Sequence, residues 1–244
     1  MMTDFTKTRA AFHLPDGMTY LDGNSLGPMP RAAADRVATM MADEWSEMLI
    51  TGWNRAGWYV QPRKVGDRIA RLIGAGDGQV VMGDTLSIKV FQALSAALAL
   101  RPDRRVILSD SGNFPSDLYV AEGIARALGA TLRVVAPEEV EAAIGPDLAV
   151  LMLTEVDYRT GRRHDMPALT ARAHEAGALA IWDLAHSAGA VDVDLLGADA
   201  DFAVGCTYKY LNGGPGAPAF IWTHPRHAEQ AEPILQGWMG HAAP

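Results

Sequence analysis

Lys209 follows a short apolar run, Asp201–Gly205, and precedes the glycine-rich turn Asn212–Gly216. Two tyrosines, Tyr208 and Tyr210, flank it. An amine becomes a useful nucleophile when partial burial lowers its pKa, and carbonyl cofactors are held by such a lysine as a Schiff base. A surface lysine after a strand would show the same local pattern. The stretch makes Lys209 a candidate Schiff-base lysine.

Asp183 ends an earlier apolar run, and His186 follows it three residues later. Pyridoxal chemistry requires a carboxylate of this kind, because an acid paired with the pyridine nitrogen keeps the ring protonated and able to accept electrons. Asp183 could instead cap a helix over Ala185–Ala190, and His186 could be an ordinary half-buried histidine. The order Asp-x-x-His and then Tyr-Lys favours a pyridoxal phosphate site.

Strand-like and helix-like segments alternate along most of the chain with short connections. This pattern, with continuous apolar runs, predicts an α/β fold in which helices cover both faces of a mainly parallel sheet. The predicted strands are Gln79–Met82, Arg105–Ser109, Thr131–Val135, Leu148–Thr154, Ala178–Trp182, Phe202–Gly205 and Ala217–Trp222. The predicted helices are Arg31–Leu49, a segment after Pro62, Thr85–Leu100, Asp117–Leu128, Pro137–Ile144 and Pro167–Glu175.

The candidate residues follow the predicted strands. Ligands of open α/β sheets bind at the carboxyl ends of the strands. The segments concerned are Asp84–Ser87, Phe114–Asp117, Thr154, Asp183 with His186, and Tyr208 with Lys209. Residues from more than half of the sequence are therefore expected on one rim of one sheet.

The composition narrows the class of protein. The 244 residues carry a formal charge of −8, and the basic residues are scattered, so we expect no nucleic-acid binding. The longest apolar run, Leu148–Leu153, is too short to cross a bilayer, and the charged first residues do not form a signal peptide. The single cysteine, Cys206, fits a reducing compartment. We expect a soluble cytoplasmic protein, and no metal site is predicted.

Three further stretches extend the pattern: Leu21–Gly27 (LDGNSLG), Asn113–Asp117 (NFPSD) and Gly237–Ala242 (GWMGHA). With the Asp183 and Lys209 segments they resemble fold-type I pyridoxal-phosphate enzymes, and within them the kynureninases. The resemblance runs over essentially the whole chain. It implies a pyridoxal 5'-phosphate cofactor on Lys209, with Asp183 and Tyr208 as the other catalytic residues.

The resemblance also assigns the remaining contacts of the site. The implied cofactor-binding residues are Leu86, Ser87, Phe114, Pro115, Ser116, Asp117, Thr154, Asp183, His186, Tyr208, Lys209 and Trp238. Ser25 and Trp53 match positions that approach the substrate from the neighbouring subunit, which implies a homodimer with a shared active site. Taken alone, the Ser87 segment could be a plain helix cap, and Phe114 and Trp53 could be core residues. The family often has Asn where this chain has Lys89, a departure that changes the local charge.

The resemblance implies hydrolysis of L-kynurenine to anthranilate and L-alanine in tryptophan degradation. It also implies hydrolysis of 3-hydroxykynurenine to 3-hydroxyanthranilate and L-alanine. Two domains are expected: residues 1–60 as an N-terminal segment for a smaller domain or dimer interface, and residues 61–244 as the cofactor-binding domain. Kynureninases continue beyond the Gly-Trp-x-Gly-His segment, so a truncated C-terminal domain without the arginine that grips the substrate carboxylate is expected. The alternatives are a cysteine desulfurase or class V aminotransferase, or an inactive remnant.

Overall fold

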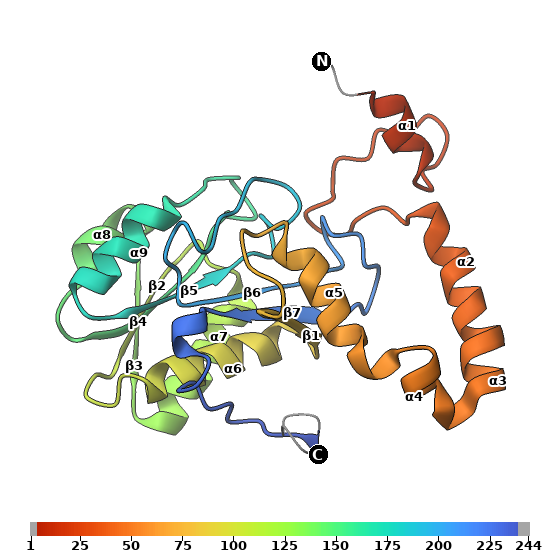
Figure 1. Ribbon diagram of the computed structural model, residues 1–244. Helices are drawn as coiled ribbons and strands as arrows, with labels where there is room; N and C mark the ends of the chain where they lie inside the picture. Colours follow the sequence, from red (N-terminus) through yellow and green to blue (C-terminus); the bar gives the residue numbers. More distant parts are fainter. Residues whose placement is uncertain (1–3, 239–244) are drawn as a thin grey trace.

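The computed structural model describes residues 4–238, and its centre is a seven-stranded sheet (Figure 1). The strand order is β1-β7-β6-β5-β4-β2-β3. Strands β6, β5, β4, β2 and β3 are parallel, whereas β7 is antiparallel to both β6 and β1. The strands are β1 (Val80–Gly83), β2 (Val106–Asp110), β3 (Thr131–Val135), β4 (Leu148–Thr154), β5 (Leu179–Asp183), β6 (Phe202–Gly205) and β7 (Ala219–Thr223).

Helices cover both faces of the sheet. Helices α6 (Leu86–Ala99) and α7 (Pro115–Leu128) pack on one face, and α5 (Gln61–Ala70), α8 (Val140–Ala143) and α9 (Met166–Glu175) pack on the other (Figure 1). Every residue of the central strand β4 is buried, because both of its faces are covered. Leu151 and Leu153 join one hydrophobic core, whereas Val150 and Met152 join the other. The predicted α/β sandwich with a mainly parallel sheet is confirmed.

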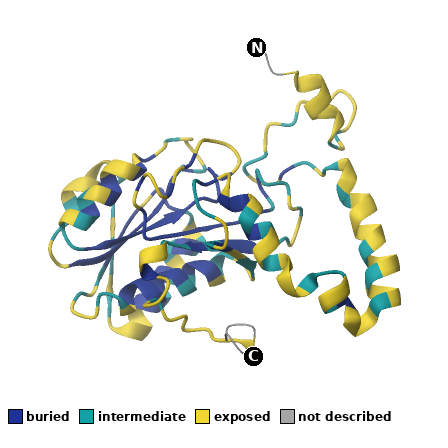
Figure 2. Ribbon diagram, viewed as in Figure 1, coloured by how far each residue is buried: buried dark blue, intermediate teal, exposed yellow. Residues whose placement is uncertain are grey.

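The N-terminal part forms an arm outside this sandwich. It comprises α1 (Phe5–Ala10), α2 (Arg31–Thr39), α3 (Ser46–Met48) and α4 (Gly52–Arg55), and Figure 2 shows it as largely exposed. The helix predicted over Arg31–Leu49 is interrupted, because Met40–Trp45 is a π-helix and a 3-10 turn begins at Leu49. Leu49 has a positive φ of 46°, a strained conformation for a residue with a side chain. The arm buries almost none of its apolar side chains in this chain.

Two further details differ from the sequence-based expectations. Ala185–Ala190 forms turns rather than a helix, so Asp183 caps no helix there. The segment predicted as one helix from Pro137 to Ile144 is a 3-10 turn (Pro137–Glu139) followed by α8. Among residues 4–238, no helix combines the length and the apolar character that crossing a membrane requires.

Asp201 anchors the segment after β7 to the start of β6. It is 1% exposed, and its Oδ1 accepts hydrogen bonds from Arg226 Nη2 at 2.6 Å and His227 Nε2 at 2.7 Å. Its Oδ2 accepts hydrogen bonds from His174 Nε2 and from the Ala180 N–H, each at 2.8 Å. Burial alone would raise the pKa of Asp201, but these hydrogen bonds outweigh burial and lower the pKa below its usual range.

Replacing Asp201 with asparagine should lower the free energy of unfolding by about 3 kcal/mol at neutral pH, because it removes the buried carboxylate that accepts hydrogen bonds from Arg226, His174 and His227. A carboxyl with a depressed folded pKa stabilises the fold above its unfolded pKa of about 4, and the contribution is lost as the pH falls below that value. The difference between the two proteins should therefore shrink in acid. Urea unfolding at pH 7 and pH 3 measures it, with exposed Asp77→Asn as the control. Equal urea midpoints at pH 7 would refute this role.

Candidate functional site

The carboxyl ends of five strands place the candidate residues on one rim of the sheet. Strand β1 leads into Thr85–Ser87, β2 into Phe114–Asp117, and β6 into Tyr208 and Lys209. Strands β4 and β5 end at Thr154 and Asp183 themselves. Ten of the residues on this rim line a small cavity of about 170 Å³: Thr85, Leu86, Ser87, Phe114, Ser116, Asp183, Ala185, His186, Tyr208 and Lys209.

Lys209 is the buried amine of this cavity. It is 5% exposed, and its Nζ lies 2.6 Å from His186 Nε2. Burial, together with the charge of Lys209, lowers the pKa of His186 to about 4. A histidine that is neutral at pH 7 can accept a hydrogen bond from the lysine. The Nδ1 atom of the same ring is buried and has no hydrogen-bond partner among the described residues.

The backbone around Lys209 is held by the turn at the start of the chain. The Gly27 N–H donates to the Tyr208 carbonyl at 2.9 Å, and the Asn212 N–H donates to the Lys209 carbonyl at 2.9 Å. A Cβ atom on Gly27 would stand 2.1 Å from the Lys209 carbonyl oxygen, so only glycine fits there. The Leu21–Gly27 motif thus packs against the lysine segment.

Two buried carboxyl groups lie beneath the cavity. Asp183 is 2% exposed and accepts a hydrogen bond from the Ala185 N–H at 2.9 Å. Thr154 Oγ1 lies 3.5 Å from Asp183 Oδ2 and 2.5 Å from Asn113 Oδ1. Asp117 is fully buried, and neither of its carboxyl oxygens has a hydrogen-bond partner among the described residues. These oxygens are available to a bound group.

Burial dominates the ionisation of both carboxyl groups. It raises the pKa of Asp183 to about 6, although the Ala185 N–H and the charge of Lys209 partly oppose it. Burial raises the pKa of Asp117 well above its usual range, and the negative charge of Asp183 raises it further. The two carboxyls therefore do not both ionise readily until a cation or a donor joins them.

Replacing Asp117 with asparagine should stabilise the cofactor-free protein by about 1–2 kcal/mol at pH 8, because it removes a buried carboxyl whose charge is opposed by Asp183. A carboxyl with a raised folded pKa favours the folded state most below its unfolded pKa, and this benefit is lost as the pH rises through the folded value. The gain should therefore disappear near pH 4. Thermal unfolding at both pH values tests it, and a lower melting temperature at pH 8 would contradict it.

The turn between β1 and α6 offers free backbone donors. Thr85 is the N-cap of α6, and its Oγ1 accepts a hydrogen bond from the Ile88 N–H at 3.4 Å. The N–H groups of Leu86 and Ser87 have no acceptor within residues 4–238. Free N–H groups and the positive end of a 14-residue helix form an anion site.

An aromatic pair lies beside the cavity, and one member of it, Tyr158, was not predicted from the sequence. The Tyr158 ring stacks on His186 at 5.9 Å and meets Phe114 edge-on at 5.0 Å. The Lys209 Nζ lies 5.3 Å from the centre of the Phe114 ring. Tyr158 follows the end of β4 by four residues. The strand-end rule that found Thr154 would have found Tyr158 if applied to the following loop.

The loop that carries Tyr158 is held by buried charges. Asp157 Oδ1 accepts hydrogen bonds from the N–H groups of Arg159 and Thr160 at 2.8 and 3.1 Å. Arg163 Nη2 lies 2.8 Å from the buried carboxylate of Glu155. These contacts hold the backbone before and after Tyr158, so the loop fixes the position of its ring.

Six of the sequence-predicted site residues do not line the cavity, among them the buried Asp117 and Thr154. Pro115 begins α7 at the rim, and Ser25 is exposed on the Leu21–Gly27 turn. Trp238 is 65% exposed, and its ring meets Trp53 edge-on at 6.3 Å, away from Lys209. Residues Met239–Ala242 of the last motif lie outside the described part of the chain.

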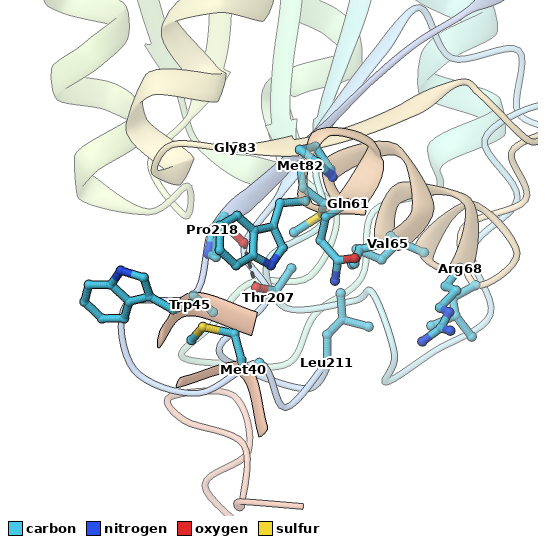
Figure 3. A pocket seen from close by; sticks show the side chains of 16 residues that line it. Met40, Trp45, Gln61, Val65, Arg68, Met82, Gly83, Thr207, Leu211 and Pro218 are labelled. Carbon is cyan, nitrogen blue, oxygen red and sulfur yellow. Dashed lines mark hydrogen bonds between the residues drawn. The ribbon is translucent and has the colours of Figure 1, made fainter. Parts of the chain in front are cut away.

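A larger cavity of about 890 Å³ lies between the arm and the sandwich (Figure 3). Met40 and Trp45 line it from the arm, Val65 from α5, and Thr207 and Leu211 from the lysine segment. Arg68 is the only charged residue in its lining, so it offers no acid–base chemistry comparable to the smaller cavity. The side chains of Thr207 and Leu211 thus face one cavity while Lys209 faces the other.

Two further side chains near Lys209 are neutral at physiological pH. Burial raises the pKa of the Cys206 thiol to about 11. Burial also raises the pKa of Tyr208 to about 12, so its hydroxyl remains a hydrogen-bond donor. A buried neutral thiol is a poor nucleophile.

The chain matches the family model described as aminotransferase class-V over residues 20–240. It is 56% identical over 241 residues to the kynureninase of Pseudomonas fluorescens and 54% identical over 243 residues to that of Burkholderia pseudomallei (strain 1106a). These alignments cover 96% and 97% of the chain but 58% of each relative. The chain therefore spans less than two thirds of the length of these curated relatives.

Solved structures share the fold at lower identity. The cysteine desulfurase CsdA of Escherichia coli aligns with a TM-score of 0.80 and 20% identity, covering 98% of this chain and 62% of that protein. A C-DES mutant with glycine linked covalently to its PLP cofactor aligns with a TM-score of 0.80 and 17% identity, covering 94% of this chain and 63% of that protein. At such identities the likeness shows the fold.

Proposed function

Because the chain belongs to the aminotransferase class-V family, we propose that it binds pyridoxal 5'-phosphate at Lys209 and hydrolyses L-kynurenine to anthranilate and L-alanine. The observation that carries the proposal is the buried Lys209 amine, bonded to His186 at 2.6 Å and placed in one cavity with Asp183. The 56% identity to a kynureninase supports this reaction over others in the family.

The residues of the cavity fit this cofactor. The free N–H groups of Leu86 and Ser87 suit a phosphate. The Asp183 carboxylate suits a protonated ring nitrogen, and a cation there would favour its ionised form against the burial that raises its pKa. The Phe114 ring supplies a flat apolar surface for an aromatic ring. Asp117 lies beneath the cavity, and its oxygens have no hydrogen-bond partner among the described residues.

When bound, the cofactor supplies an electron sink that makes the α-proton of an amino acid acidic. Lys209 Nζ is the group of this chain that holds and moves that proton, because it is the amine of the cavity. His186 accepts a hydrogen bond from Nζ and fixes the direction of the lysine. Asp183, held by the Ala185 N–H and by Thr154, would pair with the ring nitrogen and keep it protonated.

The overall reaction consumes one water: L-kynurenine and water give anthranilate and L-alanine. The bond between the β-carbon and the γ-carbonyl carbon breaks, the hydroxyl of water joins the carbonyl carbon, and a proton joins the β-carbon. Tyr208 is suited to donate a proton or hydrogen bond, because its raised pKa of about 12 keeps the hydroxyl protonated. The Tyr158 ring, which meets Phe114 edge-on at 5.0 Å, provides a second apolar surface for the aryl group of the substrate.

A cysteine desulfurase is the main alternative, since solved desulfurases share the fold. That chemistry requires a reactive cysteine thiolate. Cys206 is 3% exposed, and burial raises its pKa to about 11. Cys206 is also the only cysteine of this 244-residue sequence. The thiol chemistry therefore has less support here than hydrolysis of a carbon–carbon bond.

We further propose that the protein is a cytoplasmic homodimer. The arm presents apolar side chains with little cover in a single chain: Val37 is 51% exposed, Met41 53%, Trp45 61% and Ile50 76%. Large apolar side chains exposed together on one helical arm are typical of a protein interface. Light scattering after gel filtration should give twice the mass of the chain, and a monomer at micromolar concentration would contradict the dimer.

The activity is tested by supplying the purified protein with pyridoxal 5'-phosphate and one amino acid at a time. L-Kynurenine should give anthranilate fluorescence and an equal amount of L-alanine, and 3-hydroxykynurenine tests the hydroxylated substrate. L-Cysteine is the control for the alternative and should give no sulfur transfer above the cofactor alone. If L-cysteine gave alanine and transferable sulfur while kynurenine gave no anthranilate, the protein would be a desulfurase and the proposed hydrolysis would be wrong.

A further inference from the structure

We propose that Lys89 is a positioning residue for the cofactor phosphate, which it serves by neutralising Asp84 beside the donor turn at Leu86 and Ser87. The inference rests on the proposed cofactor and adds a residue outside the cavity lining. Lys89 lies in the second turn of α6, just after this anion site.

Lys89 is a buried lysine in an unusual place. It is 4% exposed, and its Nζ donates to Asp84 Oδ2 and to Gln92 Oε1, each at 3.0 Å. A helical side chain leans toward the N-terminus of its helix, which brings the ammonium back to the β1–α6 turn. Burying an ammonium near the positive end of a helix dipole is unfavourable by itself. The carboxylate of Asp84 offsets this cost.

Asp84 is the other half of the pair, and its place is fixed by the turn. It has a positive φ of 52°, and its carbonyl accepts a hydrogen bond from the Ala219 N–H at 3.0 Å. Aspartate tolerates this left-handed conformation better than most residues. Asp84 directly precedes Thr85, the N-cap of α6, so its carboxylate belongs to the same turn as the Leu86 and Ser87 donors, and its side chain is 55% exposed.

The charges around the turn give Lys89 its role. A phosphate ester carries between one and two negative charges at neutral pH, and the unneutralised carboxylate of Asp84 would repel it. The ammonium of Lys89 makes the Lys89–Asp84 pair neutral overall. The positive end of the α6 dipole is then the main electrostatic influence on a phosphate at this turn. Without Lys89, one negative charge remains within a few residues of the phosphate donors. Phosphate affinity, rather than affinity for the ring, should fall.

The test compares two probes, pyridoxal 5'-phosphate and pyridoxal, which lacks the phosphate. Binding of each to the cofactor-free protein is followed by quenching of tryptophan fluorescence, with circular dichroism as the check on folding. Lys89→Met should raise the Kd for pyridoxal 5'-phosphate about fivefold, as expected for one partly screened charge, and leave the Kd for pyridoxal unchanged. Asp84→Asn in the same chain should restore the phosphate affinity.

Asp84→Asn alone keeps the test decisive if Lys89→Met does not fold. Asparagine tolerates the positive φ, so this variant should bind pyridoxal 5'-phosphate about two- to fivefold more tightly than wild type, with pyridoxal unaffected. Equal losses for both probes in Lys89→Met, no rescue by Asp84→Asn, or an unchanged affinity in Asp84→Asn would each overturn the inference. Wild-type protein that binds neither probe would instead refute the proposed cofactor.

Discussion

Replacing Lys209 with alanine should lower turnover of L-kynurenine by about a thousandfold or more, because the variant loses both the covalent anchor and the group that moves the α-proton. The substitution removes the amine from the cavity, and His186 loses the hydrogen-bond partner that lies 2.6 Å away in the wild type. Initial rates of anthranilate formation measure the effect. Lys64→Ala, on an exposed position, is the matched control and should keep the wild-type rate.

The Lys209→Ala protein should still bind pyridoxal 5'-phosphate weakly. The phosphate donors at Leu86 and Ser87, the carboxylate of Asp183 and the ring of Phe114 do not depend on the lysine side chain. Dialysis should therefore remove the cofactor from the variant and not from wild type. Turnover within tenfold of wild type would show that another amine carries out the proton transfer.

Replacing Asp183 with alanine should slow exchange of the α-proton of L-alanine by about 10²–10³-fold, because the ring nitrogen loses the charge that holds it protonated. Asp183 is 2% exposed, and its carboxylate is held by hydrogen bonds from the Ala185 N–H and from Thr154. Proton NMR in deuterium oxide follows the exchange. Asp35→Ala, on an exposed face of α2, is the control.

Near-normal exchange in the Asp183→Ala protein would mean that a different carboxyl group pairs with the ring nitrogen of the cofactor. The buried Asp117 is the candidate. A parallel measurement on Asp117→Ala separates the two carboxyls. Asp183 should affect exchange far more than cofactor affinity, whereas Asp117 should affect both.

The fold was readable from the sequence because its signals are local. Continuous apolar runs such as Leu148–Thr154 become strands buried on both faces, and β3 and β4 have the predicted bounds. The π-helix at Met40–Trp45 was not predicted, because the apolar spacing there also fits a regular helix. The Ala185–Ala190 segment has helical propensity, but Asp183 accepts the Ala185 N–H and the chain turns instead.

The candidate site was readable only in part. The strand-end rule brought together Ser87, Asp183 and Lys209, since β1, β5 and β6 all end at this rim of the sheet. Tyr158 was missed because it lies in the loop after β4, four residues past the end of the strand, and the local contacts of Asp157 and Glu155 that hold this loop leave no periodic pattern. The contact of Trp53 with Trp238 joins positions far apart in the sequence, and nothing in either local stretch indicates it.

The most direct test of the account locates the covalent bond. The protein is incubated with pyridoxal 5'-phosphate, reduced with borohydride, digested and sequenced by mass spectrometry. We expect a single pyridoxyl group on Lys209, the buried lysine beside His186. A pyridoxyl group on Lys89 or Lys64 with Lys209 unmodified would contradict the central claim that this cavity is the cofactor site.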